Sequence, residues 1–224
     1  MDWGKSISRC VVVSSVLAAT SFNLGCSADG SGQGAEAVLS AALPADTEAE
    51  TSTISFAMSK WMDAAGADRV AVNGTFKGIT VSMDDKSRAS LHAQDLTHVS
   101  VQLGIDLGSL DTGMDIRNTN VKETFFAVAS FPTATVVVSD LVATQDPFVY
   151  TAKVALSAHG VTQQLSPTKI SLEQVEHGYR VRTVEPVVIV SADFGFGVAA
   201  LLARCMHKGL DASAKVQADV FVRE

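Results

Sequence analysis

The sequence has few cysteines and few basic residues, and each shortage excludes a class of protein. Cysteine occurs three times in 224 residues, at positions 10, 26 and 205, without a Cys-x-x-Cys pair. A disulfide framework and a typical zinc site are therefore excluded. Lys and Arg number 17 against 24 Asp and Glu, so the net charge is -7 and no basic cluster offers a surface to nucleic acid. We expect no nucleic-acid partner.

Sequence motifs of the common enzyme classes are also missing. The chain contains no GxSxG, HExxH or GxxxxGKS motif. Residues 195–200 fit the dinucleotide pattern GxGxxA, but only 24 residues follow them, too few for the βαβ unit that such a site needs. The pairs His92/His98 and Cys205/His207 lack further ligands at metal-binding spacing. The sequence therefore predicts no catalytic residues, no metal and no cofactor.

The first 25 residues have the pattern of an export signal. An apolar run over 10–22 follows Lys5 and Arg9, and it is too short for a membrane-spanning helix of about 20 residues. Leu24-Gly25-Cys26 resembles the end of a bacterial lipoprotein signal, in which the cysteine becomes the lipidated first residue of the mature chain. The resemblance implies a periplasmic lipoprotein that is anchored to a membrane through Cys26. Ordinary secretion is the alternative, and a disulfide with Cys205 would then be conceivable.

Residues 26–51 are rich in Gly, Ser, Ala and acidic residues, and no Lys or Arg occurs between Arg9 and Lys60. Such a segment cannot bury enough apolar surface to order itself, so a flexible linker is expected. The predicted organisation is a signal peptide over 1–25, a lipidated cysteine with its linker over 26–51, and one folded domain over 52–224.

The folded domain shows the period-2 alternation of half-buried strands. Apolar and polar residues alternate at 54–58, 154–158 and 214–222, and β-branched runs of strand length occur at 99–107, 135–141, 169–174, 179–183 and 187–191. About eight strands without a repeated helical pattern predict an all-β fold, an antiparallel barrel or sandwich. Ten Phe and six Met but only two Tyr give large side chains that mostly lack hydroxyls, which would suit an apolar ligand.

Two segments interrupt the strand pattern. In 115–126 apolar residues recur at helical spacing, and Asp111 and Thr112 stand ahead of them as candidate N-caps. The apolar segment 198–206 is expected to be a short helix or a lid. The predicted fold therefore includes one or two short helices.

Several short motifs occur in the order of a known family: VNGTF at 72–76, SLDTG at 109–113, FPT at 131–133, AHGVT at 158–162 and SADFG at 191–195. Together they resemble the YceI-like polyisoprenoid-binding family. The resemblance implies an extended antiparallel lipocalin-like β-barrel over 52–224. It also implies an exported protein that is not an enzyme and that sequesters or carries a polyisoprenoid, quinone or fatty acid derivative in an apolar interior. Lys60-Trp61-Met62 departs from the family, which often has a His shortly after the first strand's alternation.

The predicted ligand-binding residues combine the alternation with these motifs. They are Phe56, Met58, Phe76, Phe125, Phe126, Phe131, Leu156 and Phe194, with Arg117 near the mouth to meet a polar or phosphate head. His159-Gly160 is expected to form a hairpin corner. A filled barrel that acts as a structural or protein-interaction module of the envelope is the alternative, a hydrolase using His159 is a weaker one, and homodimerisation stays open.

Overall fold

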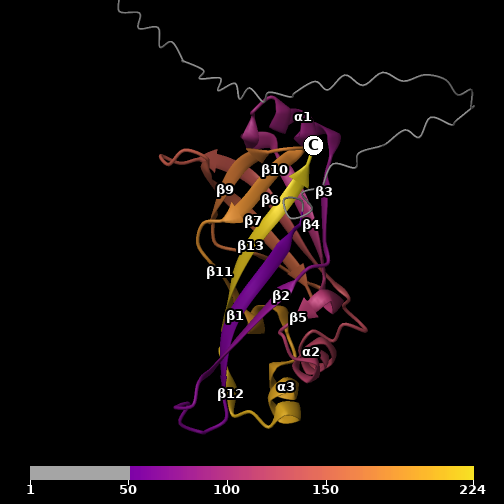
Figure 1. Cartoon of the computed structure of the whole chain (residues 1–224), viewed down its shortest axis with the longest axis vertical. Helices are drawn as coiled ribbons and strands as arrows, with labels where there is room; N and C mark the ends of the chain where they lie inside the picture. Colours follow the sequence, from indigo (N-terminus) through magenta and orange to yellow (C-terminus); the bar gives the residue numbers. More distant parts are fainter. Residues whose placement is uncertain (1–50) are drawn as a thin grey trace, which may run out of the picture. The chain divides into compact units, whose positions relative to one another are not determined.

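The structure is a computed structural model that describes residues 51–224 (Figure 1). These residues form 13 strands and three α-helices. Cys26, the expected signal peptide and nearly all of the expected linker lie outside the described residues.

One antiparallel sheet contains every strand of the described chain. The strands are β1 (Thr53–Trp61), β2 (Val70–Phe76), β3 (Ile79–Met83), β4 (Ser100–Asp106), β5 (Leu110–Asp111), β6 (Thr133–Ala143), β7 (Val149–Ala158), β8 (Val161–Gln164), β9 (Thr168–Val175), β10 (Gly178–Thr183), β11 (Val187–Val190), β12 (Gly209–Leu210) and β13 (Ser213–Arg223). The main path runs β3-β4-β6-β7-β9-β10-β13-β1-β2-β5, while β8, β11 and β12 pair beside it. This long sheet curls into a half-barrel (Figure 1), so the all-β antiparallel class is confirmed.

The first and last strands of the domain are neighbours. In the register of β1 and β13, Ile54 lies opposite Ala218 and Phe56 opposite Val216. The alternation read from the sequence places these four side chains on one face of the sheet, where they meet the core.

All eight predicted strands are confirmed. Strands β2, β3, β5, β8 and β12 were not predicted; β5 and β12 have only two residues each, too few to show alternation.

The helices differ from expectation in number and in capping. Helix α2 (Asp115–Asn120) continues as a π-helical turn over Val121–Phe125, and α3 is Val198–Cys205, so both expected helices are present. A third helix, α1 (Asp85–His92), was missed; its N-cap Asp84 accepts a hydrogen bond from the Ser87 N–H at 2.6 Å.

The expected N-cap of α2 is wrong. Met114 is the N-cap residue and makes no side-chain capping bond. The Asp111 carboxylate instead accepts from the Gly113 N–H at 2.8 Å, while the Thr112 hydroxyl donates to Asn118 Oδ1 at 2.7 Å. These short polar side chains therefore stabilise the turn before the helix rather than its first turn.

The turn between β7 and β8 confirms the predicted hairpin corner. His159 and Gly160 are the two loop residues, and both have positive φ angles, 53° and 78°. A two-residue turn of this handedness matches the twist of the paired strands, and glycine adopts it without strain. The corner brings His159 beside the segment that follows α2.

Candidate functional site

A cavity of about 280 Å³ lies along the inner face of the curled sheet. Alternate residues of β13 from Ala214 to Val222 line it, a distance of roughly 26 Å at ~3.3 Å per residue. Alternate residues of β1 from Ile54 to Lys60 line it over roughly 20 Å. The space is therefore long and narrow.

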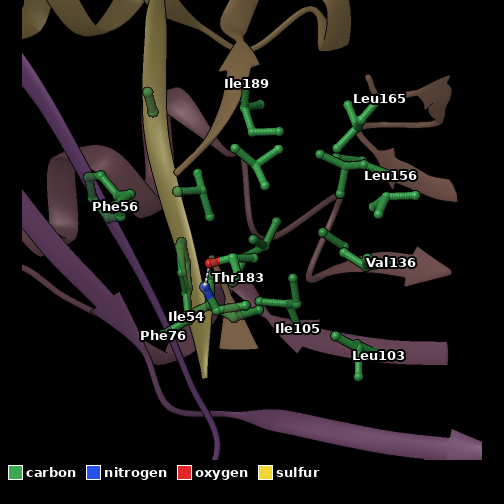
Figure 2. A pocket seen from close by; sticks show the side chains of 18 of the residues that line it. Ile54, Phe56, Phe76, Leu103, Ile105, Val136, Leu156, Leu165, Thr183 and Ile189 are labelled. Atoms are coloured by element: carbon green, nitrogen blue, oxygen red, sulfur yellow. Dashed lines mark hydrogen bonds between the residues drawn. The ribbon is translucent and has the colours of Figure 1, made fainter. Parts of the chain in front are cut away.

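The middle of the cavity is apolar. Figure 2 shows Ile105, Val136 and Ile189, from three different strands, around a common space. The hydroxyl oxygen of Thr183, a polar atom in this region, already accepts a hydrogen bond from the Ala218 N–H at 3.1 Å. A lining of this kind offers a ligand apolar contact over most of its length.

The two ends of the cavity are built from different helices, which lie at opposite ends of the half-barrel (Figure 1). Leu91 of α1 lines one end, together with Val99. Arg117 of α2 and Leu201 of α3 line the other. The Gly197 N–H donates to the Phe125 carbonyl at 2.9 Å, which ties the start of α3 to the π-helical turn.

A group of phenylalanine rings forms the wall near α2 and α3. The ring centroids of Phe76 and Phe126 are 5.9 Å apart, those of Phe125 and Phe126 4.9 Å, and those of Phe126 and Phe196 5.3 Å. The interplanar angles of 69° to 86° are the edge-to-face geometry that aromatic pairs prefer. This wall is apolar.

Most of the predicted ligand-binding residues come together in this cavity. The seven that line it are Phe56, Met58, Phe76, Arg117, Phe125, Phe126 and Leu156. Two others do not line it: Phe194 is only 1% exposed and stacks on Phe196, and Phe131 packs on the ring of His159 with centroids 4.1 Å apart. Both were predicted to bind the ligand because they are aromatic, but Phe194 belongs to the core and Phe131 is a partly buried residue that packs on the hairpin corner.

His159 has a structural role. Its Nε2 lies 2.8 Å from the Phe126 carbonyl oxygen, and because a carbonyl can only accept, Nε2 carries the proton and donates. The ring therefore locks the hairpin corner onto the segment after α2. This geometry does not support the hydrolase alternative, because the hydrogen-bond partner of the His159 ring is a backbone carbonyl and not a Ser or Asp side chain.

Sequence reasoning missed a polar group at the α2/α3 end. Lys60 Nζ lies 3.1 Å from His207 Nε2, and both residues line the cavity with Arg117. An ammonium can only donate, so His207 accepts at Nε2 and is neutral. Burial lowers the pKa of His207, and the positive charges of Lys60 and Arg117 lower it further. Lys60 was predictable as inward-facing, because it continues the parity of residues 54, 56 and 58.

The same end holds a weaker polar contact, in which Asn120 Nδ2 donates to Cys205 Sγ at 3.5 Å. Within residues 51–224 no group of three or more His, Cys, Asp or Glu side chains is arranged to hold a metal ion. In the same part of the chain, no helix has the length and apolar character needed to cross a membrane.

The fold and this site together define a class of β-protein in which one antiparallel sheet curls around a long apolar cavity. Within that class the chain belongs to the YceI-like domain family, which matches residues 46–222. Among curated proteins no match was found.

Solved structures agree with this assignment. A polyisoprenoid binding domain from Saccharophagus degradans is 21% identical with a TM-score of 0.62, covering 77% of this chain and 93% of that chain. BcnA of Burkholderia cenocepacia is 20% identical with a TM-score of 0.57, covering 76% and 96%. A Campylobacter jejuni YCEI protein is 16% identical with a TM-score of 0.51, covering 68% and 85%. Likeness at this identity establishes the shared fold.

Proposed function

We propose that the protein binds a long amphiphile, a polyisoprenoid, quinone or fatty acid derivative, and sequesters or carries it in the cavity. The observation that supports this most directly is the unfilled apolar space that runs beside β1 and β13. Burial of about 300 Å² of ligand apolar surface at ~25 cal/mol per Å² contributes about 7.5 kcal/mol before the entropic costs of association. The similar domain from Saccharophagus degradans is described as polyisoprenoid binding.

The same space counts against a filled barrel that serves only as an interaction module, because a core without a ligand is normally close-packed. The binding role needs no catalytic group. In the described part of the chain, the thiol and the imidazole that line the α2/α3 end contact other residues and not each other, since Cys205 Sγ accepts from Asn120 and His207 Nε2 lies beside Lys60.

We also propose that the protein is exported to the periplasm and anchored through acyl chains on Cys26. The support is the sequence pattern alone: the short apolar run after Lys5 and Arg9, and Leu24-Gly25-Cys26 at its end. Replacement of Cys26 by Ala should move the protein from the membrane fraction to the soluble fraction. Retention of the variant in membranes, or a mature protein without added lipid mass, would contradict the anchor.

The binding function is tested by native mass spectrometry of protein purified from a bacterial host without detergent, followed by organic extraction. A stoichiometric long-chain species is the expected result. A protein without extracted lipid, which also fails to take up isoprenoid, quinone or fatty acyl probes, would refute the proposal.

A further inference from the structure

The ionisable residues that line the cavity include three basic side chains and no carboxylate. Lys60, Arg117 and His207 line it, together with the phenol of Tyr179 and the thiol of Cys205, but no Asp or Glu does. The chain as a whole has 24 acidic and 17 basic residues, so a lining with Lys60 and Arg117 but no carboxylate runs against the composition. The cations are also not spread along the cavity, since Lys60 ends the inward row of β1 and Arg117 lies on α2.

The two cations have no carboxylate partner. Neither Lys60 nor Arg117 forms a salt bridge with any residue in the described part of the chain. The acids nearest in sequence, Asp63 and Asp115, form no salt bridge with either cation. Asp211 follows Leu210, the β12 partner of Lys60, but it accepts from Arg69 Nη1 at 2.7 Å and from the Ser59 N–H at 2.6 Å. On the helical side, Glu123 forms a salt bridge with Arg204 at 2.8 Å.

What Lys60 and Arg117 contact instead is neutral. Lys60 donates to His207 at 3.1 Å, and Arg117 Nη2 lies 3.8 Å from Met114 Sδ. All three cavity residues, Lys60, Arg117 and His207, are only partly exposed. Cations that are partly removed from water without a counter-charge leave a positive potential, and that potential is strongest where the walls are apolar. An anion placed there would accept charge-assisted hydrogen bonds from both.

We propose that the amphiphile bound by this protein has an anionic head group, a phosphate or a carboxylate, held at the α2/α3 end by Lys60 and Arg117 with His207 beside them. The chain of the ligand would then extend along β1 and β13 toward α1. The inference rests on the proposed lipid-binding function and narrows it, because a neutral quinone or alcohol would leave both cations without a counter-charge.

The test compares ligands that share a chain and differ in the head group. The affinity of the full chain, freed of lipid, is measured for geranylgeranyl monophosphate against geranylgeraniol, and for oleic acid against oleyl alcohol. At low salt at least one anion should bind about tenfold or more tightly than its alcohol, which corresponds to ~1.4 kcal/mol. The pair that shows the larger ratio identifies the head group as phosphate or carboxylate.

Variants then assign the preference to residues. Replacing Lys60 and Arg117 together by Met removes both charges and keeps much of their length, so the ratio should fall toward one through loss of affinity for the anion. Lys122→Met is the matched control, because Lys122 lies on the adjoining π-helical turn and does not line the cavity. It should leave the ratio as in the wild type.

The outcomes separate the two proposals. Equal binding of anion and alcohol by the wild type, or a ratio that survives in the double variant, would overturn the anionic head group and leave lipid binding intact. Binding of a quinone but of none of the four probes would also overturn only the head group. Failure of the four probes and of the quinone to bind, in a protein that yields no extracted lipid, would overturn lipid binding itself, and the head group with it. Unchanged circular dichroism of the double variant shows that the comparison is made on folded protein.

Discussion

Filling the cavity from within should remove ligand binding without loss of stability, and Ala218→Phe is the sharpest way to do it. Ala218 lines the cavity and lies between two core clusters, one containing Ile54 and Phe76 and the other Leu103 and Val220. Its backbone is already held, since its N–H donates to Thr183 at 3.1 Å. Because Ala218 lines the cavity and its backbone is held in place, a phenyl ring at this position would enter the space that the ligand chain needs.

The size of the effect follows from the area lost. A ring that displaces about 100 Å² of buried ligand surface costs about 2.5 kcal/mol at ~25 cal/mol per Å², or roughly 70-fold in Kd. Without ligand, the ring buries its own apolar surface in an existing void, a gain that offsets an overpacking strain of about 1–3 kcal/mol. The free energy of unfolding should therefore be close to that of the wild type.

The assay pairs ligand titration with urea denaturation for Ala218→Phe and for a control, Ala57→Phe. Ala57 is exposed on the outer face of the neighbouring strand β1, so the same change there should leave the affinity as it is. Unchanged affinity in a stable Ala218→Phe protein would refute the reasoning, because the ligand would then lie elsewhere. A strongly destabilised variant would also contradict it, because it would mean that no free space exists at this position.

Three further changes test the structure around the site. Gly197→Ala should lose about 1–3 kcal/mol in urea denaturation, because an added Cβ would lie 2.0 Å from the Thr124 carbonyl oxygen, and backbone cannot swing aside; full stability would contradict this packing. His207 lines the cavity with Lys60, Arg117 and Cys205, and its lowered pKa means that the folded state favours the neutral ring. This contribution to stability is full above the unfolded pKa of about 6.5 and is lost as the pH falls from there through the lower pKa of the folded state. The Tm of the ligand-free protein should fall on acidification, and less so in His207→Gln; parallel curves would argue against it. Burial alone would raise the pKa of Asp219, but hydrogen bonds from Arg180 and Arg182 outweigh it and lower the pKa. Asp219→Asn should therefore be less stable at neutral pH, with a gap to the wild type that closes as the pH falls below about 4; a gap that does not depend on pH would contradict the ion pair.

The strands were predictable because the alternation of apolar and polar residues that marks a strand lies within a few consecutive residues. In a strand, successive side chains point to opposite faces, so the inward parity of 54–58 and of 214–222 can be read without knowing the fold. The same parity predicted that Phe56 and Met58 face the ligand space, and it extends to Lys60. The motif order over 72–195 added the family, and with it the expectation of a ligand in the interior.

The amino-acid sequence by itself thus determined the class of the fold, most strand positions and the inward face of β1. Only the tertiary structure decided which strands are neighbours, and hence that Lys60 meets His207, 147 residues away. It also decided that Phe194 and Phe131 turn away from the cavity. The sequence could not show this, because an aromatic ring can pack equally well against other protein side chains or against a ligand. Residue type and periodicity describe how a segment contacts an interior, whereas the place where distant segments meet depends on how the whole sheet curls.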